Sequence, residues 1–265
     1  EKFDPEESLL DYAFFISENR IANLLYECKG LNVNYKFYQN KKSDYSFESC
    51  LKNAINHLDI EKIDLIISHP SFNATESFAK DDIFNRVFAM SYSLMKKLLK
   101  AMNSDVNLCS SEGKSLFTFC IENGNDESLI EFLNDKDFKP TQNEFISALI
   151  LLINGCNYNR TSVSIDILNE LVKYDLDHNN NYLNFSELLN SGKSFYTSIK
   201  PYFQNVGEIV QFFIDHNVDV NRPDLEGVYP LEYGIINESK SFIVPLLNSK
   251  KVDFSVKLNN NENYI

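Results

Sequence analysis

The sequence predicts an all-α fold, a helical solenoid built from about seven helix-turn-helix repeats. Two observations lead to this prediction. Short amphipathic segments end again and again in a pair of large apolar residues, and the intervals between these pairs are nearly regular. A single helix pair of this kind cannot bury its apolar face, but a stack of similar neighbours can, which is the physical basis of a repeat array.

The apolar pair occurs in seven copies along nearly the whole chain. These are Leu24-Leu25, Ile66-Ile67, Leu98-Leu99, Phe132-Leu133, Leu171-Val172, Phe213-Ile214 and Leu246-Leu247. The spacings between the second members are 42, 32, 34, 39, 42 and 33 residues. Three spacings lie close to a period of about 33 residues, and the others exceed it by about six to nine. We expect these insertions in polar loops at 38–44, 154–160 and 178–181.

A second apolar position supports the same register. A large apolar residue stands sixteen positions before the second member of the pair in five copies, at Leu9, Leu51, Ile83, Phe117 and Leu231. Each unit therefore contains two helical segments in fixed phase. We expect one array over 1–265, with approximate repeats at 1–37, 46–75, 78–107, 110–140, 141–180, 190–221 and 224–254.

Two units also carry a turn ahead of the first helix. Residues 105–120 read DVNLCSSEGKSLFTFC, and residues 219–234 read DVNRPDLEGVYPLEYG. Gly113 and Gly227 occupy the same place in both, and glycine tolerates the positive φ that a tight turn requires. Pro230 suits a first helical turn, where its missing N–H is not needed.

This pattern resembles the ankyrin-repeat family, whose turn reads D-x-x-G-x-T-P-L-H-x-A before a second helix that ends in a leucine pair. Tyr229, Glu232 and Gly234 stand where the family has Thr, His and Ala. The signature has decayed near Asn73 and Pro140, so we expect short or irregular inter-repeat hairpins there. The resemblance implies a protein-protein interaction scaffold whose partner lies on the concave face, made of hairpin tips and first helices.

The candidate binding residues project from the tips of the two well-formed turns and do not hold the turns together. They are Ser111, Glu112, Lys114, Leu225, Glu226 and Val228. Among them, Leu225 and Val228 are apolar at positions where we expect water, which favours contact with a partner.

Composition narrows the partner to another protein. The formal net charge is −13 and the pI is near 4.8, which argues against nucleic acid because a phosphate backbone requires clustered Lys and Arg. The longest apolar run, at 145–153, is far shorter than a membrane span of about 18 residues, so we expect no membrane insertion. Five cysteines without a CxxC motif favour a reducing intracellular compartment, the cytoplasm.

No catalytic or metal-binding constellation is evident. His69 and His216 each follow an apolar pair by two residues, where a polar helix-terminal residue is common, and His57 and His178 lack a second ligand at helical spacing. The polar segment after Asp175 lacks the glycine and glutamate of a calcium loop. Cys109 and Cys120 lie outside any basic cluster that would activate a thiol. We therefore predict neither catalysis nor a cofactor.

Two alternatives stay open at this point. The chain could be an adaptor that recruits a client to an enzyme, for example of ubiquitin-ligase or effector type, carried elsewhere in the parent protein or complex. An enzyme within this segment would need a constellation that the sequence does not contain. The absence of an initiator Met, and a closing segment at 252–263 that resembles the start of another hairpin, lead us to expect truncation at both ends.

Overall fold

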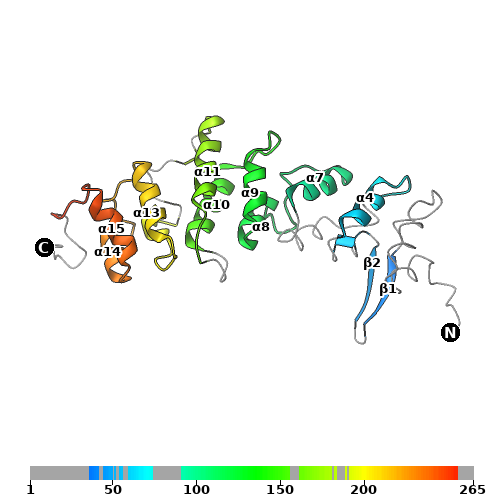
Figure 1. Ribbon diagram of the computed structural model, residues 1–265, viewed down its shortest axis with the longest axis horizontal. Helices are drawn as coiled ribbons and strands as arrows, with labels where there is room; N and C mark the ends of the chain where they lie inside the picture. Colours follow the sequence, from blue (N-terminus) through cyan, green and yellow to red (C-terminus); the bar gives the residue numbers. More distant parts are fainter. Residues whose placement is uncertain are drawn as a thin grey trace. The chain divides into compact units, whose positions relative to one another are not determined.

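The described part of the chain is helical, as the periodicity predicts. The computed structural model describes residues 36–41, 44–49, 51, 54–55, 59–73, 91–155, 161–180, 182–183, 189 and 191–255. Ten helices and one two-stranded hairpin lie within these ranges (Figure 1). The chain divides into two units, Glu1–Phe119 and Cys120–Ile265. The first predicted repeat up to residue 35, together with Ile83, His57, Cys28, Cys50 and Cys156, lies outside the described residues.

The first unit contains a β-hairpin that the helical pattern does not predict. Strands β1 (Lys36–Lys41) and β2 (Asp44–Ser49) pair antiparallel, so the expected polar insertion loop at 38–44 is wrong. In this register Tyr38 lies opposite Phe47. Aromatic residues favour extended backbone, which agrees with strand formation in a segment otherwise rich in loop residues.

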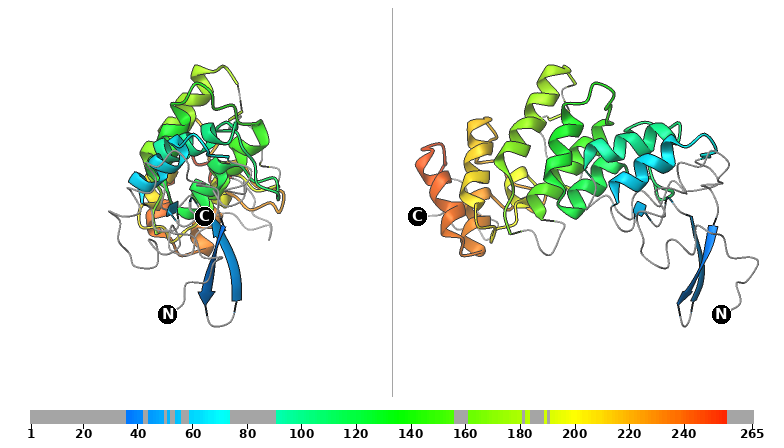
Figure 2. Two further views of the ribbon diagram at one scale, coloured as in Figure 1. Left: turned by 90° about the vertical axis from the view of Figure 1, so that its right-hand side faces the viewer. Right: turned by 45° about the vertical axis from the view of Figure 1, so that its right-hand side comes forward.

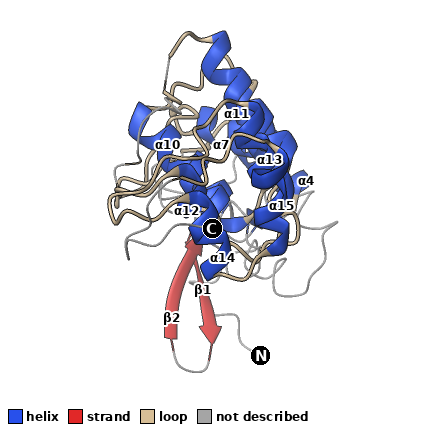
Figure 3. Ribbon diagram, turned by 90° about the vertical axis from the view of Figure 1, so that its left-hand side faces the viewer, coloured by secondary structure: helices blue, strands red, loops and turns tan. Residues whose placement is uncertain are grey.

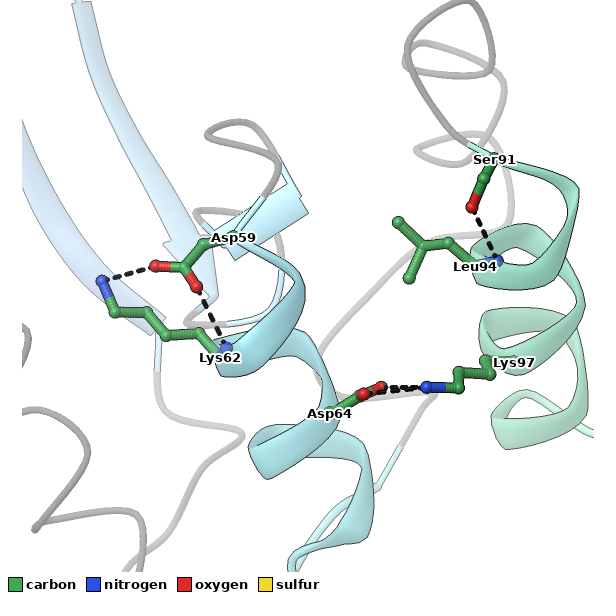
Figure 4. A network of polar contacts seen from close by, with 6 residues as sticks. All are labelled: Asp59, Lys62, Asp64, Ser91, Leu94 and Lys97. Atoms are coloured by element: carbon green, nitrogen blue, oxygen red, sulfur yellow. Dashed lines mark hydrogen bonds and ion pairs between the residues drawn. The ribbon is translucent and has the colours of Figure 1, made fainter.

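Two helices of the first unit are joined by an ion pair. Helix α4 (Ile60–Ser68) begins after Asp59, whose carboxylate accepts the Lys62 N–H, and α7 (Tyr92–Ala101) begins after Ser91, whose hydroxyl accepts the Leu94 N–H. These are ordinary N-caps. Between the helices, the Nζ of Lys97 lies 2.8 Å from both carboxylate oxygens of Asp64 (Figure 4). This pair is exposed, so it contributes little beyond orientation.

The second unit arranges its helices in two rows. Helix α8 (Leu116–Asn123) contains the boundary between the units, and the second unit continues with α9 (Asp126–Leu133), α10 (Gln142–Asn154), α11 (Ile165–Asp177), α12 (Phe195–Ser198), α13 (Val206–Asp215), α14 (Pro230–Ile236) and α15 (Lys240–Asn248). One row is α9, α11, α13 and α15, in which each helix contacts the next. The other is α10, α12 and α14 (Figure 3). Figure 2 shows α13 beside α14 and α15 from a second direction.

Aromatic side chains fill the interior of the second unit. Phe132, Phe138 and Phe145 are fully buried near one end of the rows, and Tyr196, Phe213 and Phe242 are fully buried further along. The Phe213 ring lies 5.5 Å from Phe195 and 6.0 Å from Tyr196, between centroids. Large rings at these distances contribute to packing beyond their buried area. The phenylalanine-rich composition therefore serves the core.

The apolar pairs mark helix ends at five places. The pairs at 66–67, 98–99, 132–133, 213–214 and 246–247 lie in the last turn of α4, α7, α9, α13 and α15, as predicted. The pair at 171–172 does not, because α11 continues to Asp177. The extra turn buries Tyr174 and Asp175, and the Asp175 carboxylate accepts the N–H groups of Tyr182 and Leu183 at 2.8 and 3.0 Å. The predicted insertion at 178–181 is thus partly a helix terminus.

Aspartate and asparagine side chains shape the loops that follow α7, α9, α13 and α15. The N–H of Asn107, Asp137, Asn221 and Ser255 each donates to the carboxylate two residues earlier, at Asp105, Asp135, Asp219 and Asp253. Short polar side chains favour such turns. Asn side chains also join neighbouring loops: Asn205 bonds both the N–H and the C=O of Val163. The Asn221 amide similarly bonds Lys251 O and the Asp253 N–H.

Candidate protein-binding surface

Three turns in the described chain share one hydrogen-bonding pattern, and we call them the glycine turns. They span 110–114, 189–193 and 224–228. In each, the first N–H donates to the C=O four residues later, at 2.8, 2.9 and 3.1 Å, and the N–H of the fourth residue donates back to the first C=O at 3.0, 2.7 and 3.0 Å. The fourth residue is Gly113, Gly192 or Gly227, with φ of 79°, 80° and 80°. Glycine is required there because an L side chain is strained at such φ values.

Each glycine turn leads directly into a helix of the unit. Ser115 and Ser194 follow the first two turns, and their hydroxyls accept the N–H groups of Thr118 and Thr197 at 3.2 and 3.1 Å. After the third turn, the Tyr229 N–H donates to the Glu232 carboxylate at 3.3 Å. These contacts satisfy free N–H groups at the helix start. The turns and the helices that follow them are therefore built as one element.

The predicted binding residues of the first turn are all at its surface. Ser111, Glu112 and Lys114 are exposed, while Ser115 next to them is buried. The Lys114 Nζ lies 5.6 Å from the centroid of the Phe119 ring, a cation-π distance. The turn thus presents one acidic and one basic side chain on a backbone held by its own hydrogen bonds.

In the third turn, the predicted residues differ in exposure. Glu226 is exposed, Leu225 is 79% exposed, and Val228 is half-buried. Beneath them, the buried Asp224 carboxylate accepts the N–H groups of Glu226 and Val228 at 3.0 and 2.9 Å. The expectation that Val228 faces water freely is therefore wrong, because its backbone helps to close the turn and its side chain is partly covered.

Leu225 links two neighbouring glycine turns. Its N–H donates to the C=O of Gly192 at 2.8 Å. A Cβ placed on Gly192 would lie 2.5 Å from Leu225 Cδ1, so the leucine side chain lies directly on the glycine backbone. The prediction that Leu225 is an exposed apolar residue at a tip is confirmed, but the residue also holds adjacent tips together.

The second glycine turn is the part of this surface that the sequence reasoning missed. Its signal was present, because Gly192-Lys193-Ser194 repeats Gly113-Lys114-Ser115, and a threonine follows three residues after each serine. Ser191 and Lys193 are exposed, and they are further candidate binding residues because their positions in the turn match those of Glu112 and Lys114.

The three described histidines act as structural helix caps. His69, His178 and His216 are the C-caps of α4, α11 and α13, so His178 begins the predicted loop at 178–181 directly after the helix. His178 and His216 bond the C=O four residues earlier through Nδ1, and each ring lies 4.2 Å from the aromatic ring at that position. Within the described ranges, no three His, Cys, Asp or Glu residues converge to hold a metal ion.

The two described cysteines differ in environment. Cys109 is exposed, and its Sγ lies 3.7 Å from the C=O oxygen of Asn107. Cys120 is buried, and burial raises the pKa of its thiol well above the usual range. The Cys120 thiol therefore stays protonated near neutral pH.

Comparison of the sequence with known proteins identified no relative. No protein-family model matches the chain, and no curated protein is significantly similar to it in sequence. In the parts of the chain that are described, no helix has the length and apolar character needed to cross a bilayer. The candidate surface is therefore argued from the chain's own geometry.

Proposed function

We propose that this chain is a degenerate ankyrin-type array that binds a protein partner through the tips of its glycine turns, without catalysis. The observation that carries the proposal is the recurrence of one turn, with the same hydrogen bonds and the same positive φ, ahead of helices α8, α12 and α14. Gly192 and Gly227 are 35 residues apart, close to the period of the apolar pairs. The helix contacts along each row of the second unit also suit stacked repeats.

The tips are suited to recognition because their exposed side chains lie on turns that backbone hydrogen bonds and a glycine hold in place. Glu112, Lys114, Ser191, Lys193 and Glu226 are all exposed there. Exposed residues on a rigid scaffold are where binding specificity is usually placed. The mixed charges favour a polar protein surface as the partner rather than a polyanion.

The test compares charge reversals at the tips with equal reversals elsewhere. The tip variant carries Glu112→Arg and Glu226→Arg, and the control carries Glu131→Arg and Asp166→Arg on exposed positions of α9 and α11. Both variants change the net charge equally, so general electrostatic effects cancel. Binding partners are captured with the tagged chain and quantified by mass spectrometry.

We expect partners of the original chain to be lost from the tip variant and kept by the control. Equal recovery with both variants would refute the tips as the binding surface. Leu225→Glu is a poorer test, because the leucine covers Gly192 and its loss disturbs the turn itself.

A further inference from the structure

Helix α15 has one face that is closely packed against the rest of the second unit. Phe242 and Leu246 are fully buried there. A methyl group on Gly207 of α13 would lie 2.9 Å from the C=O oxygen of Ser241 and 3.7 Å from the Pro245 ring. Pro245 has no N–H to donate to this carbonyl, and Gly207 has no side chain, so the backbones of α13 and α15 approach closely here. This contact defines the inner face of α15.

The opposite face of α15 is apolar and exposed. Val244 is 51% exposed and Leu247 is 42% exposed. They stand four and seven residues after Lys240, which is also exposed, so all three share one side of the helix. Two large aliphatic side chains in line on one helix face form the kind of apolar strip that a partner can cover.

The charges beside this strip all have the same sign. Between Glu238 and Asp253 every charged residue is a lysine: Lys240 before the strip, and Lys250 and Lys251 after it. All three are exposed. The whole chain has a net charge of −13, so this segment differs from its surroundings. A ligand for it must combine apolar side chains with carboxylates at both ends.

We infer that the outer face of α15, formed by Lys240, Val244 and Leu247, together with Lys250 and Lys251 just after the helix, docks an acidic amphipathic helix of a protein partner. An amphipathic helix supplies apolar residues at i, i+3, i+4 and i+7 that match the strip, and its flanking glutamates reach the lysines. An anionic bilayer fits less well, because interfacial membrane binding scales with the apolar area that is buried, and Val244 and Leu247 supply only two aliphatic side chains. This surface is separate from the glycine-turn tips, so either proposal can fail alone.

The test uses a fluorescent, hydrocarbon-stapled peptide helix with leucines at i, i+3, i+4 and i+7 and glutamates beside them. Its binding to the 265-residue chain is measured by fluorescence anisotropy. We expect saturable binding that Val244→Asp with Leu247→Asp weakens by about thirtyfold or more, as is typical of anchor residues. Leu176→Asp is the matched control, since Leu176 is 70% exposed on α11, and it leaves binding unchanged.

A charge exchange keeps the test decisive even if the aspartates perturb the fold. Lys240→Glu with Lys251→Glu changes only exposed residues. We expect this variant to lose the acidic peptide and to bind a peptide in which lysines replace the glutamates. Equal binding of both peptides by both proteins, or absence of binding by the original chain, overturns the proposal.

Two other occupants would also overturn it. Sedimentation equilibrium that shows a dimer in the original chain and a monomer in the Val244→Asp, Leu247→Asp variant would assign the face to a second copy. Flotation with phosphatidylserine vesicles, lost in the same variant and accompanied by no peptide binding, would assign it to a lipid surface.

Discussion

The glycine turns and the loop at 134–141 lead into the same kind of helix, but they are held in different ways. A glycine turn closes through its own backbone bonds around one residue of positive φ. The loop at 134–141 has neither this bond pair nor a glycine. Its peptide oxygens are bonded from outside, by the hydroxyl of Tyr174 to Phe138 O at 2.9 Å and by that of Tyr182 to Pro140 O at 3.1 Å.

This difference shows how a helix can keep its start when the turn ahead of it lacks glycine. Within the loop, the Asp137 N–H donates to the Asp135 carboxylate, and Thr141 and Glu144 form a capping box at the start of α10. The Phe138 side chain of this loop is buried, and its ring centroid lies 5.5 Å from that of Phe132. A self-supporting turn leaves its tip side chains exposed, whereas a loop held by neighbours depends on those neighbours. We therefore expect binding residues on the former and sensitivity to distant substitution in the latter.

The largest expected effect comes from a side chain placed on a glycine turn that has a neighbour. Gly192→Ala combines the cost of a positive φ with crowding against Leu225, and we expect a loss of about 2–3 kcal/mol in the free energy of unfolding. The matched variant is Gly113→Ala, because Gly113 has the same φ but no atom within 4 Å of an added Cβ. It should lose only about 1 kcal/mol. Urea denaturation measures both.

The difference between the two alanine variants isolates the contact between neighbouring turns. If both variants lose the same free energy, Leu225 does not constrain Gly192 and the turns are independent. Combining Gly192→Ala with Leu225→Ala should recover part of the loss, because the shortened side chain removes the crowding.

A smaller effect is expected where the loop depends on a tyrosine hydroxyl. Tyr174→Phe removes a buried hydrogen bond to Phe138 O, and we expect a loss of about 1–2 kcal/mol. Amide hydrogen exchange should increase at 134–141 in particular. Tyr202→Phe is the control, since Tyr202 is 77% exposed. Loss of its hydroxyl should not change the free energy of unfolding measurably. Unchanged exchange in the loop of the Tyr174 variant would mean that the loop supports itself.

Much of the helical framework can be predicted from the sequence, because it follows from the apolar period. Five of the apolar pairs end helices, and Phe117 and Leu231 lie buried in α8 and α14 at the predicted positions. The glycine turns before Phe117 and Leu231 can be predicted too, because glycine stands at the same distance ahead of both apolar residues. Periodicity and φ > 0 are both local properties.

The parts that could not be predicted depend on contacts between distant residues. Nothing local shows that Tyr174 bonds Phe138 O or that Leu225 covers Gly192, since these partners are 36 and 33 residues apart. The length of α11 follows from burial of Tyr174, and the β-hairpin from pairing of two polar segments. The turn at Gly192 was local and could have been found from its repeat of Gly-Lys-Ser.

The same tyrosine gives the loop at 134–141 a dependence on alkaline pH. Burial raises the pKa of Tyr174 to about 12, compared with about 10 in an unfolded chain. Its contribution to stability is therefore complete below about pH 10 and is lost as the pH rises toward 12. We expect the original chain to be more stable than Tyr174→Phe at pH 8 and to lose this advantage progressively above pH 10. Urea denaturation of both proteins across this range measures the difference, in which the effects of other ionising groups cancel. An advantage that stays constant to pH 12 would show that the hydroxyl is accessible to solvent and that Phe138 O is held by something else.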